Sequence, residues 1–272
     1  MKKITKFFVT ACVGLTVLGA ASGCNRYVGD YTYAQKSFIE SGSGEIVSLS
    51  IDYENAAIEV KFDPSATAVS VSYPQMQTKS GKELSEVTVR ETANALTIEE
   101  DTDVIFKLGV GINTPEAKIS VVLPATRTYA LDLSVDNGAI TFLGDSAALS
   151  SLTIDTDNGA IALSATEVNV AGRVEMTTDN GAISVGKLTA SALMIETDVG
   201  AVSASELFAP EVTVSVDVGE IDVTLAGKKE EWSVVAETNV GESNISTNVD
   251  TARPYKLTLS TDVGGIKANF LG

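Results

Sequence analysis

Aspartates recur at nearly even intervals in the second half of the chain, each two residues before a glycine. A row of carboxylates is a candidate calcium site, because Ca²⁺ takes carboxylate and carbonyl oxygens as ligands. Carboxylate pairs also perform the acid–base hydrolysis of glycosidic bonds. These aspartates follow a repeat instead of clustering, which favours a cation or a structural role over catalysis. They are Asp136, Asp157, Asp179, Asp198, Asp217 and Asp262.

Each aspartate begins one copy of a short phrase, of which Asp136-Asn137-Gly138-Ala139-Ile140 is the first. Counting a further copy that begins at Asn239, the starting positions are 21, 22, 19, 19, 22 and 23 residues apart. Apolar residues alternate with Ser, Thr, Asp and Glu on both sides of the glycine. A period of about twenty residues is typical of a repeat architecture, and the alternation predicts half-buried strands. Each repeat is therefore a strand, a glycine turn and a second strand.

Two folds fit this repeat. Asn-Gly between alternating runs is a strong signal for a hairpin with a type I′ turn, which would give an antiparallel meander. The later copies have Val199, Val218, Val240 and Val263 in place of Asn, and a β-branched residue is an outlier at positive φ. We therefore predict an all-β, single-domain β-solenoid with coils of about 20 residues. The antiparallel meander is the alternative.

Stacked coils would place equivalent residues about 4.8 Å apart. In sequence order the aspartate column would be interrupted at Asn239 and resume at Asp262. Its carboxylates would either bond the turn amides two residues on, as Asp commonly does, or bind calcium. The residue after each aspartate is expected to point inward, so that Asn137, Asn158 and Asn180 form a ladder of stacked amides.

Trp232 is the only tryptophan and follows a charged connection. It either stacks on a sugar ring as a ligand-binding residue or caps the edge of the core. The last coil runs to Gly272 without an evident polar cap. End-to-end association through an open strand edge is therefore expected to be available.

The N-terminus carries three lysines within its first six residues, followed by the apolar stretch Phe7–Ala21. This stretch is short for a membrane span and is typical of a signal peptide. Ala21-Ser22-Gly23-Cys24 resembles the lipobox of bacterial lipoproteins, which implies that Cys24 is lipidated after removal of residues 1–23. Cys12 would be lost with that segment, leaving one thiol in need of a role. A plain secretory cleavage near Ala21 is the alternative.

The predicted organisation is a signal peptide at 1–23, a tether at 24–44 and one solenoid domain at 45–272. Residues 101–118 interrupt the repeat and are expected to form a long loop or a protruding hairpin. The protein would be extracytoplasmic and held on a bacterial membrane, at the cell surface or on the periplasmic face.

Degenerate copies precede the regular ones. Ala56 and Asn94 stand where the glycine is expected, and Leu96 and Ile98 would then follow the second of these turns. Another strand is expected to stop at Pro74, because proline cannot donate to a strand ladder.

Composition narrows the function classes. The net charge is −17, and removal of residues 1–23 would take away three lysines and no acid, giving −20. Such a surface repels nucleic acid and anionic lipid headgroups, and it is compatible with divalent cations or basic partners. The chain has no histidine, the commonest general base and metal ligand. We expect no enzyme activity and no cofactor other than calcium.

The strand Lys118–Pro124, the run Leu131–Val135 and the Asn-Gly turn that follows are together similar to the bacterial "putative adhesin" family. The resemblance covers residues 41–272 and implies an all-β solenoid at the cell envelope. It brings no catalytic residues. The expected function is a non-enzymatic binding, adhesion or scaffold module for an envelope or extracellular polymer or protein. An envelope-stress or signalling accessory and a carbohydrate-active enzyme are the alternatives.

Overall fold

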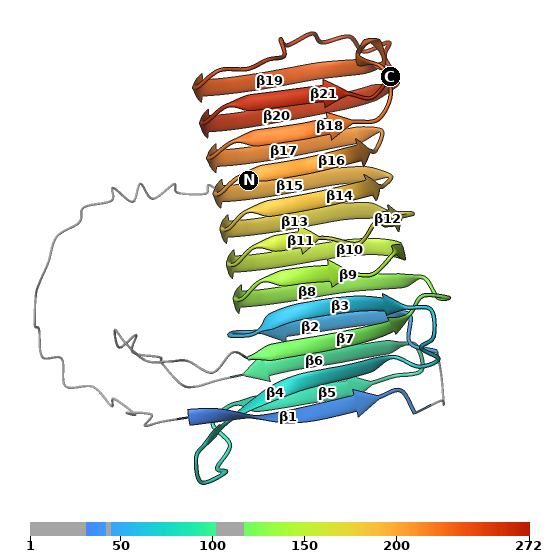
Figure 1. Cartoon of the computed structure of the whole chain (residues 1–272), viewed down its shortest axis with the longest axis vertical. Coiled ribbons are helices and arrows are strands. Elements are labelled where there is room, and N and C mark those ends of the chain that lie inside the picture. Colours follow the sequence, from blue (N-terminus) through green and yellow to red (C-terminus); the bar gives the residue numbers. More distant parts are fainter. Residues whose placement is uncertain (1–30, 42–44, 102–116) are drawn as a thin grey trace, which may run out of the picture.

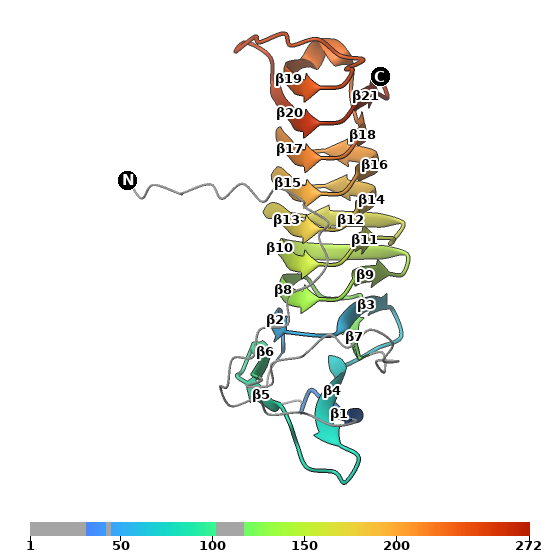
Figure 2. The same ribbon diagram turned by 90° about the vertical axis from the view of Figure 1, so that its left-hand side faces the viewer.

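The computed structural model describes residues 31–41, 45–101 and 117–272, and it confirms the β-solenoid. Strands stack in two columns that face each other, as Figure 2 shows. We name them by their place before or after the turns. The pre-turn column runs β5 (Glu86–Glu91), β6 (Ala95–Asp101), β2 (Ser48–Tyr53), β8 (Tyr129–Asn137), β10 (Ser146–Asn158), β13 (Arg173–Asn180), β15 (Ala192–Val199), β17 (Glu211–Val218), β20 (Tyr255–Val263) and β19 (Trp232–Val240).

The post-turn column lies opposite and is joined to the first through β12 (Glu167–Val170), which pairs with both β10 and β14. It runs β1 (Tyr31–Ile39), β4 (Ser70–Thr78), β7 (Lys118–Pro124), β3 (Ala57–Asp63), β9 (Ile140–Leu143), β11 (Ile161–Leu163), β14 (Ile183–Thr189), β16 (Val202–Phe208), β18 (Ile221–Leu225) and β21 (Ile266–Phe270).

The core is built from the alternate residues of both columns. Leu131, Leu152 and Val174 are consecutive partners in register, and each is buried. On the opposite side of the core, the post-turn column has a matching row of buried register partners, Ile140, Ile161 and Ile183. Because side chains of a strand alternate between faces, every coil presents the same inward set to its neighbours. The coils pair in parallel. Among the described strands, antiparallel pairs are β1–β4, β4–β7 and β5–β6, all at the end of the solenoid that holds β1, which we call the proximal end; the end that holds β19 is the distal end.

The order of coils in the stack departs from the order of the sequence at both ends (Figure 1). The coil β2–β3 lies between β6–β7 and β8–β9. At the other end β20 pairs with both β17 and β19. The last coil of the sequence is therefore the penultimate coil of the pre-turn column, and the sequential stacking expected from the repeat is wrong there.

The proximal end corrects two further expectations and leaves a third untested. The segment predicted as a tether contains β1, which pairs with β4 along all of Tyr31–Ile39. The strand expected to stop at Pro74 continues through it, because β4 leaves β7 after Ser72 and needs no donor on that side beyond it. Residues 102–116 lie outside the described residues, and so does most of the loop expected at 101–118.

The second degenerate copy is a hairpin. β5 and β6 pair antiparallel, and Thr92 donates its N–H to Ala95 O at 2.8 Å in the turn. Leu96 and Ile98 are in register with Leu49 and Ile51 of β2, so they belong to the pre-turn column. We had expected Leu96 and Ile98 to lie in a post-turn strand, and this expectation is wrong. Apolar residues alternate in the same way before and after a turn, so the pattern does not distinguish the two strands.

The distal end carries a cap, contrary to the expectation of an open edge. Residues 241–254 lead from β19 back to β20 and cover the last strands. Val234 and Asn248 exchange backbone hydrogen bonds of 3.0 and 2.8 Å, which occupies the edge of β19. Asn244 bonds β21 through its backbone N–H to Ile266 O and through its side chain to both backbone groups of Ala268.

Helix is nearly absent from the part of the chain that the structure describes, where the 3-10 turn η1 (Lys229–Glu231) is the one helical element. Within those residues no helix has the length and apolar character needed to cross a membrane.

Candidate functional site

The glycine turns stack into one long edge, seen on the left of Figure 1. We call it the turn edge and define it as each aspartate or Asn239 with the three residues that follow. Its backbone is held by very close approach between coils. A Cβ built on Gly181 would lie 1.8 Å from Gly159 O, and one on Gly219 would lie 1.7 Å from Gly200 O. Glycine is therefore required here because the neighbouring carbonyl leaves no room for a side chain.

Threonines inside the edge complete this arrangement. The residue before each aspartate points inward, and Thr178 donates its hydroxyl to Gly159 O at 3.1 Å. Thr261 bonds Gly219 O at 3.2 Å, and Thr238 bonds Gly264 O at 3.0 Å. The glycine carbonyl thus gains a buried donor from the next coil. The sequence carries this signal as a repeated Thr before the aspartate, which our sequence reasoning counted only as apolar alternation.

The aspartates form the predicted column and are exposed along the turn edge. Asp157 lies beside Asp136, because the residues on either side of both are paired in register. Their order differs from the prediction. Asp262 follows Asp217 directly, and Asn239 ends the row and donates its amide to Asp262 Oδ1 at 3.0 Å.

The column has an electrostatic cost. Partial burial raises the pKa of Asp136, and repulsion from Asp157, Asp52 and Asp155 raises it further. The pKa of Asp179 is raised in the same way, by burial and then by its neighbours in the row. Within the described ranges no three His, Cys, Asp or Glu side chains converge on a point where a metal ion would be held. The geometry gives the calcium hypothesis a row of single carboxylates without a coordination cage.

The residues after the aspartates point outward, so the predicted inward direction is wrong, whereas the predicted ladder of stacked amides is confirmed. Asn158 donates its amide to Asn137 Oδ1 and Asn180 donates to Asn158 Oδ1, both at 3.2 Å, and all three side chains are exposed. Two consecutive residues face solvent because the strand ends at this corner and its alternation stops. The valines at the same position are 47 to 63% exposed.

Trp232 belongs to the core. Its side chain is fully buried, its ring lies 5.1 Å from that of Tyr255, and its Nε1 donates to Ala226 O at 3.3 Å. The ring is therefore not presented to a sugar, which supports the core-capping interpretation and corrects its assignment as a ligand-binding residue. Trp232 and Tyr255 are partners in register, and Tyr129 holds the same place seven residues before its own aspartate. That recurring aromatic position was the missed signal.

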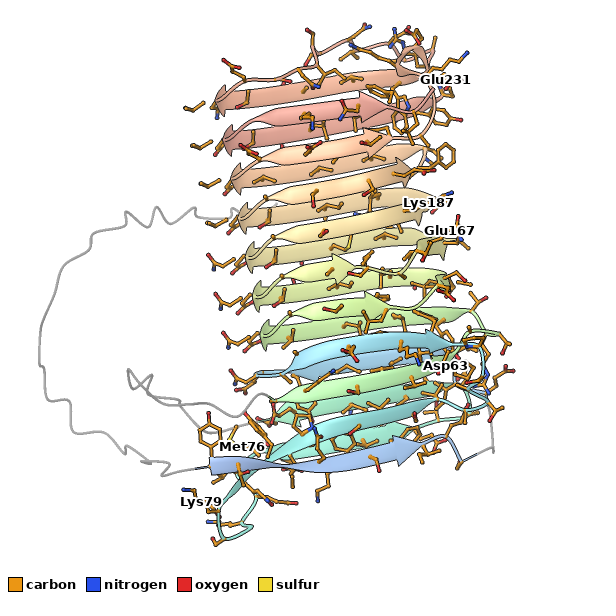
Figure 3. All side chains as sticks on the ribbon, in the orientation of Figure 1. Asp63, Met76, Lys79, Glu167, Lys187 and Glu231 are labelled. Carbon is orange, nitrogen blue, oxygen red and sulfur yellow. The ribbon has the colours of Figure 1, made fainter. Side chains whose placement is uncertain are left out.

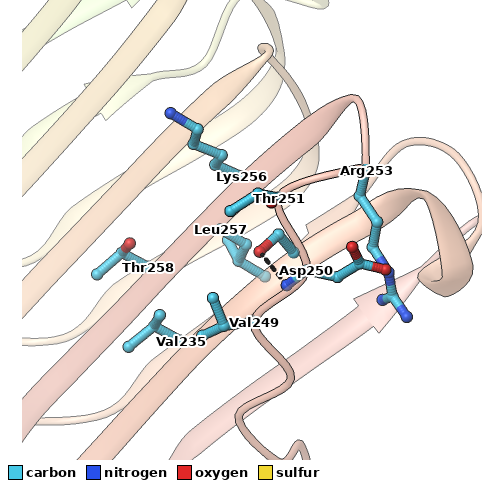
Figure 4. A pocket seen from close by; sticks show the side chains of 9 residues that line it. Val235, Val249, Asp250, Thr251, Arg253, Lys256, Leu257 and Thr258 are labelled. Carbon is cyan, nitrogen blue, oxygen red and sulfur yellow. Dashed lines mark hydrogen bonds and ion pairs between the residues drawn. The ribbon is translucent and has the colours of Figure 1, made fainter.

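A hollow of about 410 Å³ opens on the outer face of the pre-turn column beside the cap (Figure 4). Arg253 is fixed there by Asp250 and by the backbone oxygen of Trp232. Lys256 stands at the rim as an exposed cation. The sequence has no local motif that predicts this hollow, because the hollow forms only when β20 lies beside β19. Its lining comprises Ser233, Val235, Val249, Asp250, Thr251, Arg253, Lys256, Leu257 and Thr258.

Glu100 is a second feature that the sequence did not reveal. Glu99 and Glu100 both belong to β6. Glu100 Oε1 is buried without a hydrogen-bond partner in the described part of the protein. Burial raises the pKa of Glu100. Burial, together with Tyr31 and Glu100, raises the pKa of Tyr33 to about 12.

Comparisons with solved structures find distant likenesses. A "putative cell adhesion protein" from Clostridium sporogenes is 11% identical with a TM-score of 0.37, covering 88% of this chain and all of that one. "Putative adhesins" from Bacteroides fragilis and Parabacteroides merdae are 12 and 10% identical, with TM-scores of 0.40 and 0.41. They cover 87 and 89% of this chain, and 97% of each neighbour is matched. At these scores the likenesses carry no argument about activity.

A comparison with curated proteins finds no match. A family model described as Toastrack DUF4097 matches residues 38–271. That span includes every strand from β2 to β21 and the end of β1. The chain therefore belongs to the Toastrack DUF4097 family.

Proposed function

We propose that this protein is a lipid-anchored, extracytoplasmic module that binds an envelope or extracellular polymer or protein without turning it over. The observation that carries the proposal is the outer face of the pre-turn column, where parallel strands from β6 to β20 hold equivalent side chains in register. Stacked repeats build extended binding surfaces of this kind.

The hollow at the distal end of this face is the candidate binding site for the ligand. It combines an exposed cation, Lys256, with hydroxyl groups and the apolar side chains of Val235 and Val249. Binding sites typically join an apolar lining to a few placed polar groups. The turn edge, with its column of aspartates, would repel an acidic polymer. Lys256 is a cation that such a polymer could contact instead.

A binding screen tests this function. The Cys24→Ser protein would be applied to immobilised envelope polymers and glycans, and retained polymers would be assayed for released products. We expect retention of an acidic polymer, no product, and at least tenfold weaker retention of Lys256→Glu. Lys82→Glu, exposed in the turn after β4 at the proximal end, makes the same charge change away from the hollow and serves as control. Product release, or equal retention of both variants, would contradict the proposal.

The anchor is tested separately. Cys24 lies outside the described residues, and its lipidation rests on the resemblance to a lipobox. Cys24→Ser is expected to move the protein from the membrane fraction to the aqueous fraction, whereas Cys12→Ser leaves it on the membrane. Continued membrane fractionation of Cys24→Ser would overturn the anchor.

A further inference from the structure

The turn edge changes character along its length. In the position after each aspartate, the proximal coils hold Asn137, Asn158 and Asn180. The distal coils hold valines, and the change occurs where Asn180 is the register partner of Val199. The valines continue without a break through the rearranged end, in the spatial order Val199, Val218, Val263 and Val240. We call these four residues the valine stripe.

The valine stripe is exposed without a structural need for valine. Its members are 50, 48, 47 and 63% exposed in that spatial order. The proximal coils form the same turn with asparagine, and the glycines in both halves approach the neighbouring carbonyl equally closely. Asparagine also gains amide hydrogen bonds between coils. The protein thus exposes a contiguous apolar row where a polar residue makes the same turn.

The surroundings of the valine stripe are acidic. Asp198, Asp217 and Asp262 precede three of the valines, and Glu220 and Glu242 lie on the other side of two of the turns; all five are exposed. The turn edge has no Lys or Arg in these four copies. Lys187, by contrast, lies at the opposite edge between Glu167 and Glu206, with Nζ at 3.4 and 3.5 Å from their oxygens (Figure 3).

This charge pattern selects among partners. A second copy docked through the same edge would bring two acidic rows together, and an anionic membrane would be repelled. A basic partner is attracted, because complementary potentials steer association and fix register. The row spacing is about 4.8 Å, close to the rise of about 5.4 Å per turn of an α-helix. Apolar side chains at successive turns of a helix therefore match the valines one to one.

We propose that the valine stripe docks a basic amphipathic helix of about four turns from a partner protein. Its apolar side chains pack on the four valines, and its Lys or Arg side chains flank them beside Asp198, Asp217 and Asp262. This recognition follows the general mode in which a helix lays its apolar face on an apolar surface. The proposal uses a different surface from the hollow and does not depend on the proposed polymer binding.

The test uses the full chain and a synthetic helical peptide with Leu on one face and Lys on the others. We expect the wild-type protein to bind it, and a Val199→Asn, Val218→Asn, Val240→Asn and Val263→Asn variant to bind at least tenfold more weakly. This variant keeps the net charge and copies the residue of the proximal turns. It therefore separates stripe docking from general attraction to an acidic protein. Equal affinity of variant and wild type would overturn the proposal.

Two control peptides and a second set of variants complete the test. A peptide with Glu in place of Lys, and one with the same composition in scrambled order, should each bind at least tenfold more weakly to wild type. Equally tight binding of either peptide would also overturn the proposal. If the quadruple variant fails to fold, the stripe can be lengthened instead by Asn137→Val, Asn158→Val and Asn180→Val. The lengthened stripe should bind a longer peptide of the same pattern more tightly, and unchanged affinity would count against docking.

Discussion

The middle of the solenoid and its two ends are held together in different ways. From β8 to β18 the coils stack in sequence order, and each repeats the same inward side chains, glycine contact and buried hydroxyl or valine. The ends depend on single polar contacts and on coils placed out of sequence order. Repetition therefore builds the length of the molecule, whereas particular residues at each end determine where stacking stops.

The proximal end depends on a buried ion pair. Glu40 accepts hydrogen bonds from Ile46 N at 2.7 Å and Val69 N at 3.0 Å, and from Arg127 at 2.8 Å. The side chains of Glu40 and Arg127 are 3 and 16% exposed. Burial acts to raise the pKa of Glu40, but these hydrogen bonds and the guanidinium outweigh it, so the pKa lies below its ordinary value.

Arg127→Ala is expected to cause the largest loss, about 3–5 kcal/mol of unfolding free energy, because it leaves a buried carboxylate without its charge partner. Arg173→Ala, which breaks an exposed pair with Glu175, should cost less than about 1 kcal/mol. Urea unfolding measures both. Because the folded pKa of Glu40 is lowered, its contribution exists above the ordinary glutamate pKa and is lost as pH falls through the lowered value. Equal losses of unfolding free energy for the two variants would contradict the proposed difference between the proximal end and the middle of the solenoid.

Gly181→Ala tests the middle. A Cβ there would meet Gly159 O at 1.8 Å, and backbone cannot yield as a flexible side chain does. We expect a loss of about 3 kcal/mol or more, the upper range for overpacking. Gly186→Ala lies in the same coil, where a Cβ would come only to 3.3 Å from Ala165 O, and should cost much less. Thermal unfolding of the two variants measures the difference. Equal losses of stability would contradict the close approach of the backbone at Gly181.

At the distal end, Asn244→Ala removes the side-chain bonds to β21. We expect a loss of about 1–3 kcal/mol, because buried backbone groups are left without partners. Opening that edge should also promote end-to-end association. Sedimentation at increasing concentration, with Asn248→Ala as a control that keeps the backbone bonds to Val234, distinguishes loss of the cap from general destabilisation. A monomeric Asn244→Ala protein of wild-type stability would show that the cap is dispensable.

Glu100→Gln should have the smallest effect and the opposite sign. The carboxylate has a buried oxygen without a partner and a raised pKa, so the folded state favours its protonated form. The amide is expected to stabilise the protein by about 1 kcal/mol at neutral pH. The gain should shrink as pH falls through the raised pKa, because wild-type Glu100 is then neutral as well. A gain that does not vary with pH would point to packing instead of charge.

The sequence predicts the coil well and the assembly of coils less well. Alternation predicted half-buried strands on both sides of each turn, and valine in the turns favoured the solenoid over the antiparallel meander. The orientation of Asn137 and Val199 was missed because a period of two cannot be extended through a corner. The stacking order was missed because every copy presents the same inward pattern and so does not encode its neighbour. Glu40 and Asn244 act through distant partners, which one sequence does not reveal.

The cap and the hollow both depend on the order of coils at the distal end, where β20 lies between β17 and β19. Cysteines at Val218 and Val263, in a chain with Cys12 and Cys24 replaced by Ser, would lie in adjacent coils within disulfide reach. Cysteines at Val218 and Val240 would lie two coils apart, about 9.6 Å, which is too far to bridge. We expect rapid oxidation of the first pair alone. Oxidation of the second pair alone would mean that the coils stack in sequence order and would contradict this expectation.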